Sequence, residues 1–87
     1  MEIGFPKFCV ALGRRVRAMR LERKMTQEDM MDQGFAIRHY QRIEAGHSIT
    51  LQTLWKLAQA FGVSPRAILP PGFVPGGGRS KGRAARR

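Results

Sequence analysis

The clearest helix-start signal in the sequence is Met25-Thr26-Gln27-Glu28-Asp29-Met30. The hydroxyl of Thr26 can cap the first turn, and Asp29 stands three residues later, at the position that completes a capping box. Gly34 follows after about two turns, and glycine commonly ends a helix. The sequence therefore predicts a short helix that begins near Thr26 and ends before Gly34.

The pattern of another short helix follows, from about Ala36 to Ala45, with Gly46 as its stop. When this segment is projected at about 100° per residue, one side carries Ala36, Tyr40 and Ile43. The other side carries Arg38, Gln41, Arg42 and Ala45. We expect the first set to pack against the rest of the protein and the second set to face solvent.

Two longer amphipathic helices flank this pair, over about residues 7–24 and residues 51–61, and Thr50 can cap the second of them. Their apolar stripes are Phe8, Leu12, Val16 and Met19 in the first and Leu51, Leu54, Ala58 and Phe61 in the second. Each stripe has the spacing of one helix face, so we expect both to line a common core.

A last short helix is expected after Ser64 and Pro65, which suit a cap and a first helical position, and it ends before Pro70. No stretch alternates apolar and polar residues as a half-buried strand does. The predicted fold class is therefore all-α, with five helices.

Charge and composition divide the chain at Pro70. Residues 1–69 contain eleven basic and six acidic residues, whereas residues 70–87 contain five basic residues and no acidic one. We predict one helical domain over residues 1–69 and a flexible, Pro/Gly-rich basic tail over residues 70–87. The net charge of +10 favours a polyanionic partner such as nucleic acid.

The sequence lacks the usual signs of an enzyme or a metal site. His39 and His47 have no cluster of further metal ligands near them, and Cys9 has no evident base beside it. We expect no metal, no cofactor and no enzymatic activity, and we expect Cys9 and the five methionines to pack in the core.

The apolar runs are much shorter than the roughly 20 residues of a membrane-spanning helix. No leading segment has the pattern of a secretion signal, and the single cysteine cannot form an internal disulfide. A soluble protein of a reducing cytoplasm, with no membrane partner, is expected.

The outward side of the predicted 36–45 helix carries residue types that can read DNA bases. Arg38 and Arg42 can each donate two hydrogen bonds to guanine, and Gln41 can pair with adenine. Ile37, at the edge of this side, can contact a thymine methyl group. The alternative is an ordinary solvated helix face, and the residues alone leave both interpretations open.

Three motifs, in the order in which they occur along the chain, together resemble the Cro and phage-repressor family of helix-turn-helix domains, also called the XRE family. They are the Thr26-Gln27-Glu28 opening, the Ile43-Glu44-Ala45-Gly46 closing and the Gly62-Val63-Ser64-Pro65 end. The resemblance covers about residues 12–69. It implies a five-helix lambda-repressor-like domain that binds double-stranded DNA in a bacterial nucleoid or a phage-infected cell, with its third helix in the major groove.

The resemblance also implies roles for individual residues. The positions that contact base edges are those of Ile37, Arg38, Gln41 and Arg42. Gln27 matches the residue that binds a phosphate at the start of the second helix. In similar proteins, one loop runs along the phosphates of the second DNA strand. The matching loop in this chain contains His47, Ser48 and Thr50.

Arg20 and Glu44 match a pair that joins the first helix to the end of the third. This match predicts a partly buried ion pair that orients the third helix without touching DNA.

Three departures from the family pattern concern the predicted second and third helices and the turn between them. Between Met30 and Gly34 the chain is one residue shorter, so the reader positions could slip by one. Met31 stands where the family prefers alanine, and Ala36 replaces the usual Ser or Thr cap, so the third helix is expected to begin weakly or late.

The expected function is a DNA-binding transcription regulator, with repression as the expected mode and a homodimer as the expected assembly. The dimer contact would use the fourth and fifth helices or Phe73-Val74, and Trp55 fits either this contact or the core. The alternative is a protein-interaction module, such as an antitoxin or docking adaptor, for which a protein is the main partner and DNA binding is secondary.

Overall fold

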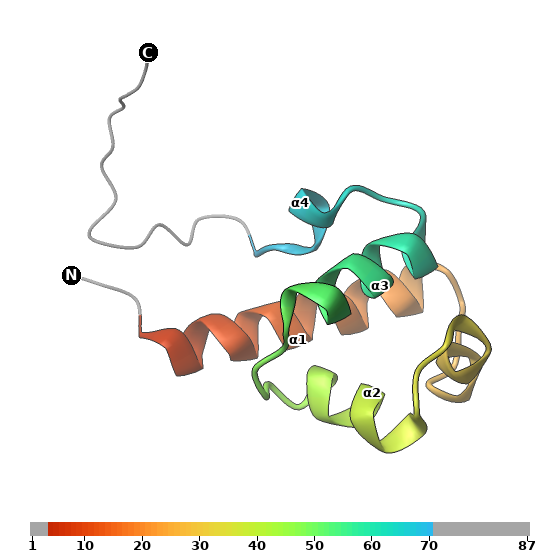
Figure 1. Ribbon diagram of the computed structural model, residues 1–87, viewed down its shortest axis with the longest axis horizontal. Coiled ribbons are helices and arrows are strands. Elements are labelled where there is room, and N and C mark those ends of the chain that lie inside the picture. The colour runs from red at the N-terminus through yellow and green to blue at the C-terminus, as the bar shows by residue number, and fades with distance from the viewer. Residues whose placement is uncertain (1–3, 71–87) are drawn as a thin grey trace, which may run out of the picture.

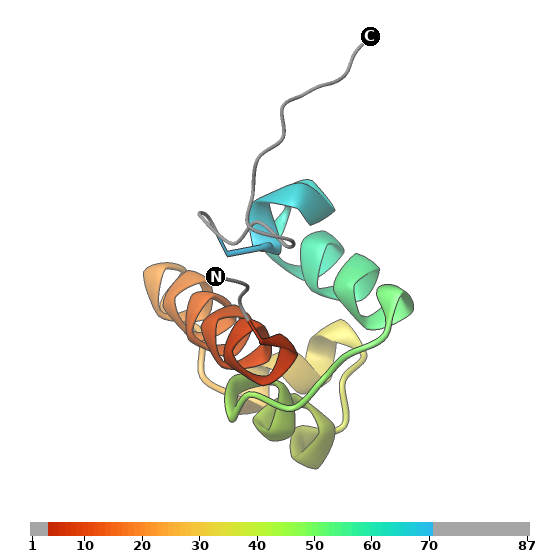
Figure 2. The same cartoon turned by 90° about the vertical axis from the view of Figure 1, so that its left-hand side faces the viewer.

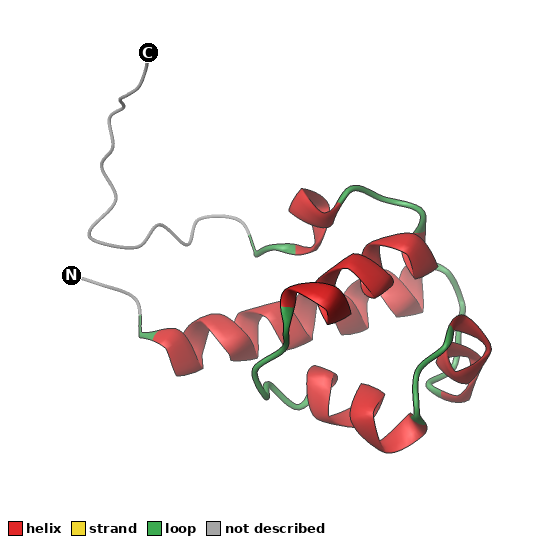
Figure 3. Cartoon of the chain, in the orientation of Figure 1, coloured by secondary structure: helices red, strands yellow, loops and turns green. Residues whose placement is uncertain are grey.

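The structure, a computed structural model, describes residues 4–70 of the chain. Its elements, in chain order, are α1 (Phe5–Glu22), the 3-10 helix η1 (Glu28–Gln33), α2 (Ile37–Glu44), α3 (Leu51–Phe61) and α4 (Pro65–Ile68). Within residues 4–70 there are helices and loops but no strand (Figure 3). The predicted all-α class with five helices is confirmed. The predicted tail lies outside the described residues, apart from Pro70, which is buried.

The two longest helices, α1 and α3, form the centre of the domain (Figure 1). Both views place α2 on one side of them and α4 on the opposite side (Figure 1 and Figure 2). α1 contacts α2, α3 and α4, and η1 contacts α2 and α3. The buried core that these contacts enclose consists of Leu12, Val16, Met19, Met30, Phe35, Tyr40, Ile43, Leu54, Leu57, Ala58, Phe61 and Ile68.

Several helix ends have the caps that the sequence predicts. The backbone N–H of Asp29 donates to Oγ1 of Thr26 at 3.0 Å, and the backbone N–H of Thr26 donates to Oδ2 of Asp29 at 2.8 Å. Thr50 Oγ1 accepts from the backbone N–H of Thr53 at 3.1 Å and so caps α3. Gly34 ends η1 with a φ of 96°, a left-handed conformation that costs glycine little.

The segment after Thr26 is wound more tightly than an α-helix, which the sequence did not predict. A 3-10 helix has three residues per turn, so consecutive side chains point in well-separated directions. Met30 therefore faces the core, and Met31 points outward with 52% of its surface exposed. The expectation that all methionines fill the core is wrong at Met31.

The stripe predicted for α3 is correct at Leu54, Ala58 and Phe61, which are buried, and wrong at Leu51. Leu51 is the first residue of α3 and is 83% exposed, because side chains at this end point back beyond the core. Trp55 is 57% exposed, so the interpretation of Trp55 as a core residue is also wrong.

Two predicted helix starts differ in detail. α2 begins at Ile37, and Ala36 before it is exposed rather than packed, with no side chain that can cap the helix. Ser64 makes no side-chain cap hydrogen bond, so its predicted cap is wrong. α4 begins with Pro65, whose fixed φ suits a first helical position.

Candidate nucleic-acid interface

α2 has one buried side and one exposed side. Tyr40 and Ile43 are buried in the core and fix the rotation of the helix about its axis. The exposed side carries Arg38, Gln41 and Arg42, as the projection of the sequence predicts. Ile37 lies between the two sides and is half-buried. The four predicted base contacts thus lie together on one short helix.

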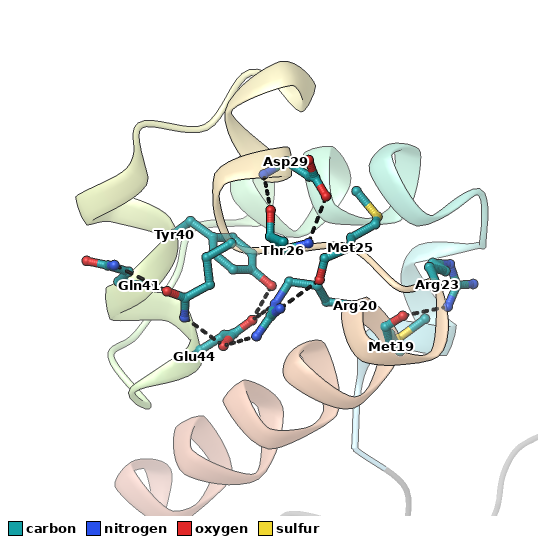
Figure 4. Close-up of polar contacts among 10 residues, drawn as sticks. Met19, Arg20, Arg23, Met25, Thr26, Asp29, Tyr40, Gln41 and Glu44 are labelled. Carbon is teal, nitrogen blue, oxygen red and sulfur yellow. Dashed lines mark hydrogen bonds and ion pairs between the residues drawn. The ribbon is translucent and has the colours of Figure 1, made fainter.

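Glu44, the last residue of α2, is held by side chains from outside and inside that helix (Figure 4). Arg20 donates from Nε to Oε2 of Glu44 at 2.6 Å and from Nη2 to Oε1 at 3.2 Å. The Tyr40 hydroxyl donates to Oε2, and the Gln27 side-chain amide donates to Oε1 at 3.1 Å. The side chains of Arg20 and Glu44 are only 8% and 7% exposed, so the expected partly buried ion pair is present and ties α2 to α1.

The electrostatics of this cluster favour its charged form. Burial alone raises the pKa of Glu44, but hydrogen bonds from Arg20, Tyr40 and Gln27 outweigh it and hold that pKa below its ordinary value. The hydrogen bond to Glu44 raises the pKa of Arg20, and burial raises the pKa of Tyr40. A carboxylate, a guanidinium and a neutral phenol therefore meet at neutral pH, and Glu44 is a structural anion rather than an acid catalyst.

Gln27 connects this cluster to the exposed side of α2. Its Oε1 accepts from Nε2 of Gln41 at 3.2 Å, while its own amide nitrogen donates to Glu44. Sequence reasoning treated Gln27 and Gln41 as separate DNA contacts and missed this bond between them. A side-chain amide has two N–H donors, so the bond to Glu44 leaves Gln27 a second donor beside Gln41.

The winding of η1 sets the length of the segment that leads from Thr26 to the turn before α2. Six residues of a 3-10 helix rise about 2.0 Å each and span about 12 Å. Six residues of an α-helix rise about 1.5 Å each and span about 9 Å. As a 3-10 helix, η1 therefore spans about 3 Å more than the same six residues would span as an α-helix.

Gly13 lets α1 approach the end of α2 closely. A Cβ at this position would lie 2.6 Å from the carbonyl oxygen of Ile43 and 2.8 Å from that of Glu44. Those distances are far shorter than an ordinary contact between a methyl group and an oxygen, so only glycine fits. Sequence reasoning followed the apolar stripe of this helix and missed Gly13, although a glycine inside a helix often marks a close approach of two backbones.

The loop between α2 and α3 holds the other predicted phosphate contacts. His47 and Ser48 are exposed, and the backbone N–H of His47 donates to the carbonyl of Arg42 at 3.1 Å. The Thr50 hydroxyl donates to Oγ1 of Thr53 at 3.2 Å and accepts from the Thr53 backbone N–H at 3.1 Å. The hydroxyl of Thr50 is therefore committed to capping α3.

Lys56 of α3 reaches over the turn between η1 and α2. Its Nζ donates to the carbonyl of Gly34 at 2.7 Å and lies 4.6 Å from the centre of the Phe35 ring. The Phe35 ring also stacks with His39 of α2. Sequence reasoning missed Lys56, because a contact between a cation and a distant aromatic ring has no local sequence signal. These contacts hold the turn that sets where α2 begins.

Among residues 4–70, no group of three or more His, Cys, Asp or Glu side chains is placed to hold a metal ion. Cys9 is free and buried. No helix in this part of the chain combines the length and the hydropathy that a membrane-spanning segment needs.

A helix-turn-helix family model matches residues 16–68. The match covers more than half of the chain and runs from within α1 to the last residue of α4, so it includes η1, α2 and the turn between them. No curated protein and no solved structure gives a significant match. The chain therefore belongs to the XRE family of DNA-binding helix-turn-helix domains.

Proposed function

We propose that this protein is a transcription regulator that binds duplex DNA sequence-specifically, with α2 in the major groove. The observation that carries the proposal is the exposed side of α2, where Arg38, Gln41 and Arg42 lie opposite a buried Tyr40 and Ile43. In helix-turn-helix domains the second helix of the motif enters the major groove, and here that helix is α2. The arginines would bind guanine, Gln41 would bind adenine, and Ile37 would contact a thymine methyl group.

The phosphate contacts would flank this reading helix on both sides. Gln27 would use its second amide N–H to bind a phosphate while its Oε1 holds Gln41, so that one residue joins backbone positioning to base reading. On the other side, His47 and Ser48 would donate hydrogen bonds to phosphates of the second DNA strand. Thr50 would act through the free N–H groups at the start of α3, since its hydroxyl is already bonded.

The proposed assembly is a homodimer on a two-fold symmetric site, with the two α2 helices about 34 Å apart. Contacts between the subunits would involve α3 and α4, which lie away from the α2 surface, and the exposed Trp55 ring offers apolar area for them. A dimer bound over a promoter would act as a repressor by blocking access to it.

Selection of bound duplexes from random DNA tests the proposal, and an enriched palindrome is the expected result. On the enriched duplex, Arg38→Ala and Arg42→Ala should each cost about 1 to 3 kcal/mol of binding free energy, with a smaller loss on random duplexes. Arg17→Ala is the matched control, because it removes the same charge from an exposed position on α1, outside α2 and outside the helices of the proposed subunit contact.

Equal losses on enriched and random duplexes would reassign Arg38 and Arg42 to phosphate contacts. A selection without any enrichment would instead favour the protein-interaction module.

A further inference from the structure

An apolar pocket opens on the surface between the start of α1, the start of α3 and the end of α4. Its walls include Phe5, Leu12, Ile49, Leu51, Leu54 and Leu69. Its volume is about 150 Å³, and an apolar cavity of about that size can hold a benzene ring. None of its lining residues comes from η1 or α2, so the proposed base reading makes no use of it.

The rim of this pocket leaves large apolar side chains uncovered. Phe5, Leu51 and Leu69 are 62%, 83% and 40% exposed. Removing apolar surface from water stabilises a protein, so an apolar segment within reach would gain by covering this rim. The described chain ends at Pro70, which is buried and directly follows Leu69 in the pocket wall. The remainder of the chain therefore starts at this pocket.

Phe73 and Val74 are the only large apolar residues after Pro70. Phe73 follows Leu69 by four residues, a separation that an extended chain spans in at most about 14 Å. Gly72 between them permits a sharp turn back toward the domain. From the size of the pocket, the exposure of its rim and this reach, we infer that the Phe73 ring, with Val74 beside it, occupies the pocket of its own chain.

This docking would place the basic end of the chain near DNA, a consequence that rests on the proposed function. Ile49 and Thr50 line the pocket and belong to the loop that carries the proposed phosphate contacts of His47 and Ser48. Arg79 follows Phe73 by six residues, or at most about 22 Å. Residues 79–87 carry five positive charges, and an anchor at Phe73 would raise their effective concentration beside the phosphates at this loop.

Methyl NMR spectra of the full-length chain without DNA test the docking by itself. Loss of the aromatic ring in Phe73→Ala should shift the methyl resonances of Ile49, Leu51 and Leu69 by more than their linewidths. The Leu21 methyl resonances, from the far end of α1, should not move, and Ser80→Ala should move none of them. Unshifted pocket resonances in Phe73→Ala would overturn the inference.

Two other occupants would give different results in the same experiment. If Phe73 of a second copy occupied the pocket, the difference in resonance positions between the parent and Phe73→Ala would disappear on about hundredfold dilution. An intramolecular contact does not depend on concentration, so its shifts would remain. Ile3, which precedes Phe5, would be the occupant if Ile3→Ser shifted these resonances and Phe73→Ala did not. Either outcome would overturn docking of Phe73 in its own chain.

Affinity for a random duplex at low salt tests the consequence for DNA. Phe73→Ala and Leu51→Ser should each weaken binding by about threefold to tenfold. A second full-length chain carries Arg79→Gln, Lys81→Gln, Arg83→Gln, Arg86→Gln and Arg87→Gln. In that chain, the further change Leu51→Ser should have no effect on affinity. Unchanged affinity in both single variants, with shifted pocket resonances, would overturn the placement of the basic residues and leave the docking intact. A parent chain without any DNA affinity would refute the proposed function alone.

Discussion

Glu44 accepts hydrogen bonds from Arg20, Tyr40 and Gln27, so its charge binds α1 and the start of η1 to the end of α2. Glu44→Gln keeps the shape of the side chain but leaves the guanidinium of Arg20 without a counter-charge. Breaking a buried ion pair costs about 3 to 5 kcal/mol, and we expect about 3 kcal/mol here because both side chains keep some contact with solvent. Urea unfolding measures the loss. Glu28→Gln, at an exposed position in η1, is the control, and equal stability of the two variants would contradict this role of Glu44.

The same carboxylate should make stability depend on pH. The folded pKa of Glu44 lies below its ordinary value of 4.5, so the unfolded chain binds this proton more tightly than the folded chain does. The stabilisation is therefore fully present above about pH 4.5 and is lost as the pH falls through the folded pKa. Between about pH 7 and about pH 3, the parent's Tm should fall more steeply than the Tm of Glu44→Gln. Parallel curves would assign the acid sensitivity to other carboxylates.

For the substitution Gly13→Ala, helix propensity and packing predict opposite effects on stability. In an isolated helix, Gly→Ala stabilises by about 1 kcal/mol. Here the new Cβ would meet the carbonyl oxygens of Ile43 and Glu44, and such overpacking costs about 1 to 3 kcal/mol. We expect Gly13→Ala to lower the Tm and, because it pushes the end of α2 away from α1, to weaken binding to the enriched duplex. A variant with a higher Tm than the parent would show that the two helices can separate without cost.

At the scale of single elements, α2 begins without a side-chain cap. Ala36 has an extended backbone and offers no side-chain acceptor to the first free N–H groups of α2. Ala36→Ser would supply an acceptor, and a serine cap is typically worth about 1 kcal/mol relative to alanine. We expect a higher Tm for Ala36→Ser and no gain for Ala36→Val, which adds bulk without an acceptor. Equal Tm values for the two variants would mean that the start of α2 does not limit stability.

The elements that could be predicted from the sequence are those whose signals are local. Three such signals each depend on residues within one turn of one another. They are the capping box of Thr26 and Asp29, the Thr50 cap, and the alternation of Tyr40 and Ile43 with exposed arginines. The 3-10 winding of η1 could not be predicted, because the choice between i+3 and i+4 hydrogen bonds depends on how the segment packs.

The parts of the candidate site that sequence reasoning missed depend on contacts between elements. Gly13 against the end of α2, Gln27 against Gln41 and Lys56 over Phe35 each join residues far apart in the chain. No local pattern encodes which of these residues meet. Arg20 and Glu44 are also far apart in the sequence, and their pairing could be predicted only through the family resemblance.

At the scale of the whole molecule, the positive charge is shared equally between two parts of the chain. Residues 1–69 carry a net charge of +5, and residues 70–87 carry the other +5 without any acidic residue. In the first part, the six acidic residues offset many of the basic ones, and specificity would come from the few exposed donors of α2. The second part has no such pattern, so its attraction to DNA would depend on charge and not on base sequence.

The placement of half of the positive charge in residues 70–87 predicts how the affinity for DNA depends on salt concentration. Each phosphate that a protein neutralises contributes about 0.9 to the slope of log K against log salt, so five basic residues in contact would contribute up to about 4.5. A full-length chain with Gln at positions 79, 81, 83, 86 and 87 should therefore show a flatter slope on both enriched and random duplexes. Its ratio of enriched to random affinity should stay unchanged, whereas Arg38→Ala should lower that ratio. Parallel slopes for the parent and the five-Gln chain would mean that residues 79–87 do not touch DNA, since charges that neutralise no phosphate release no counterions.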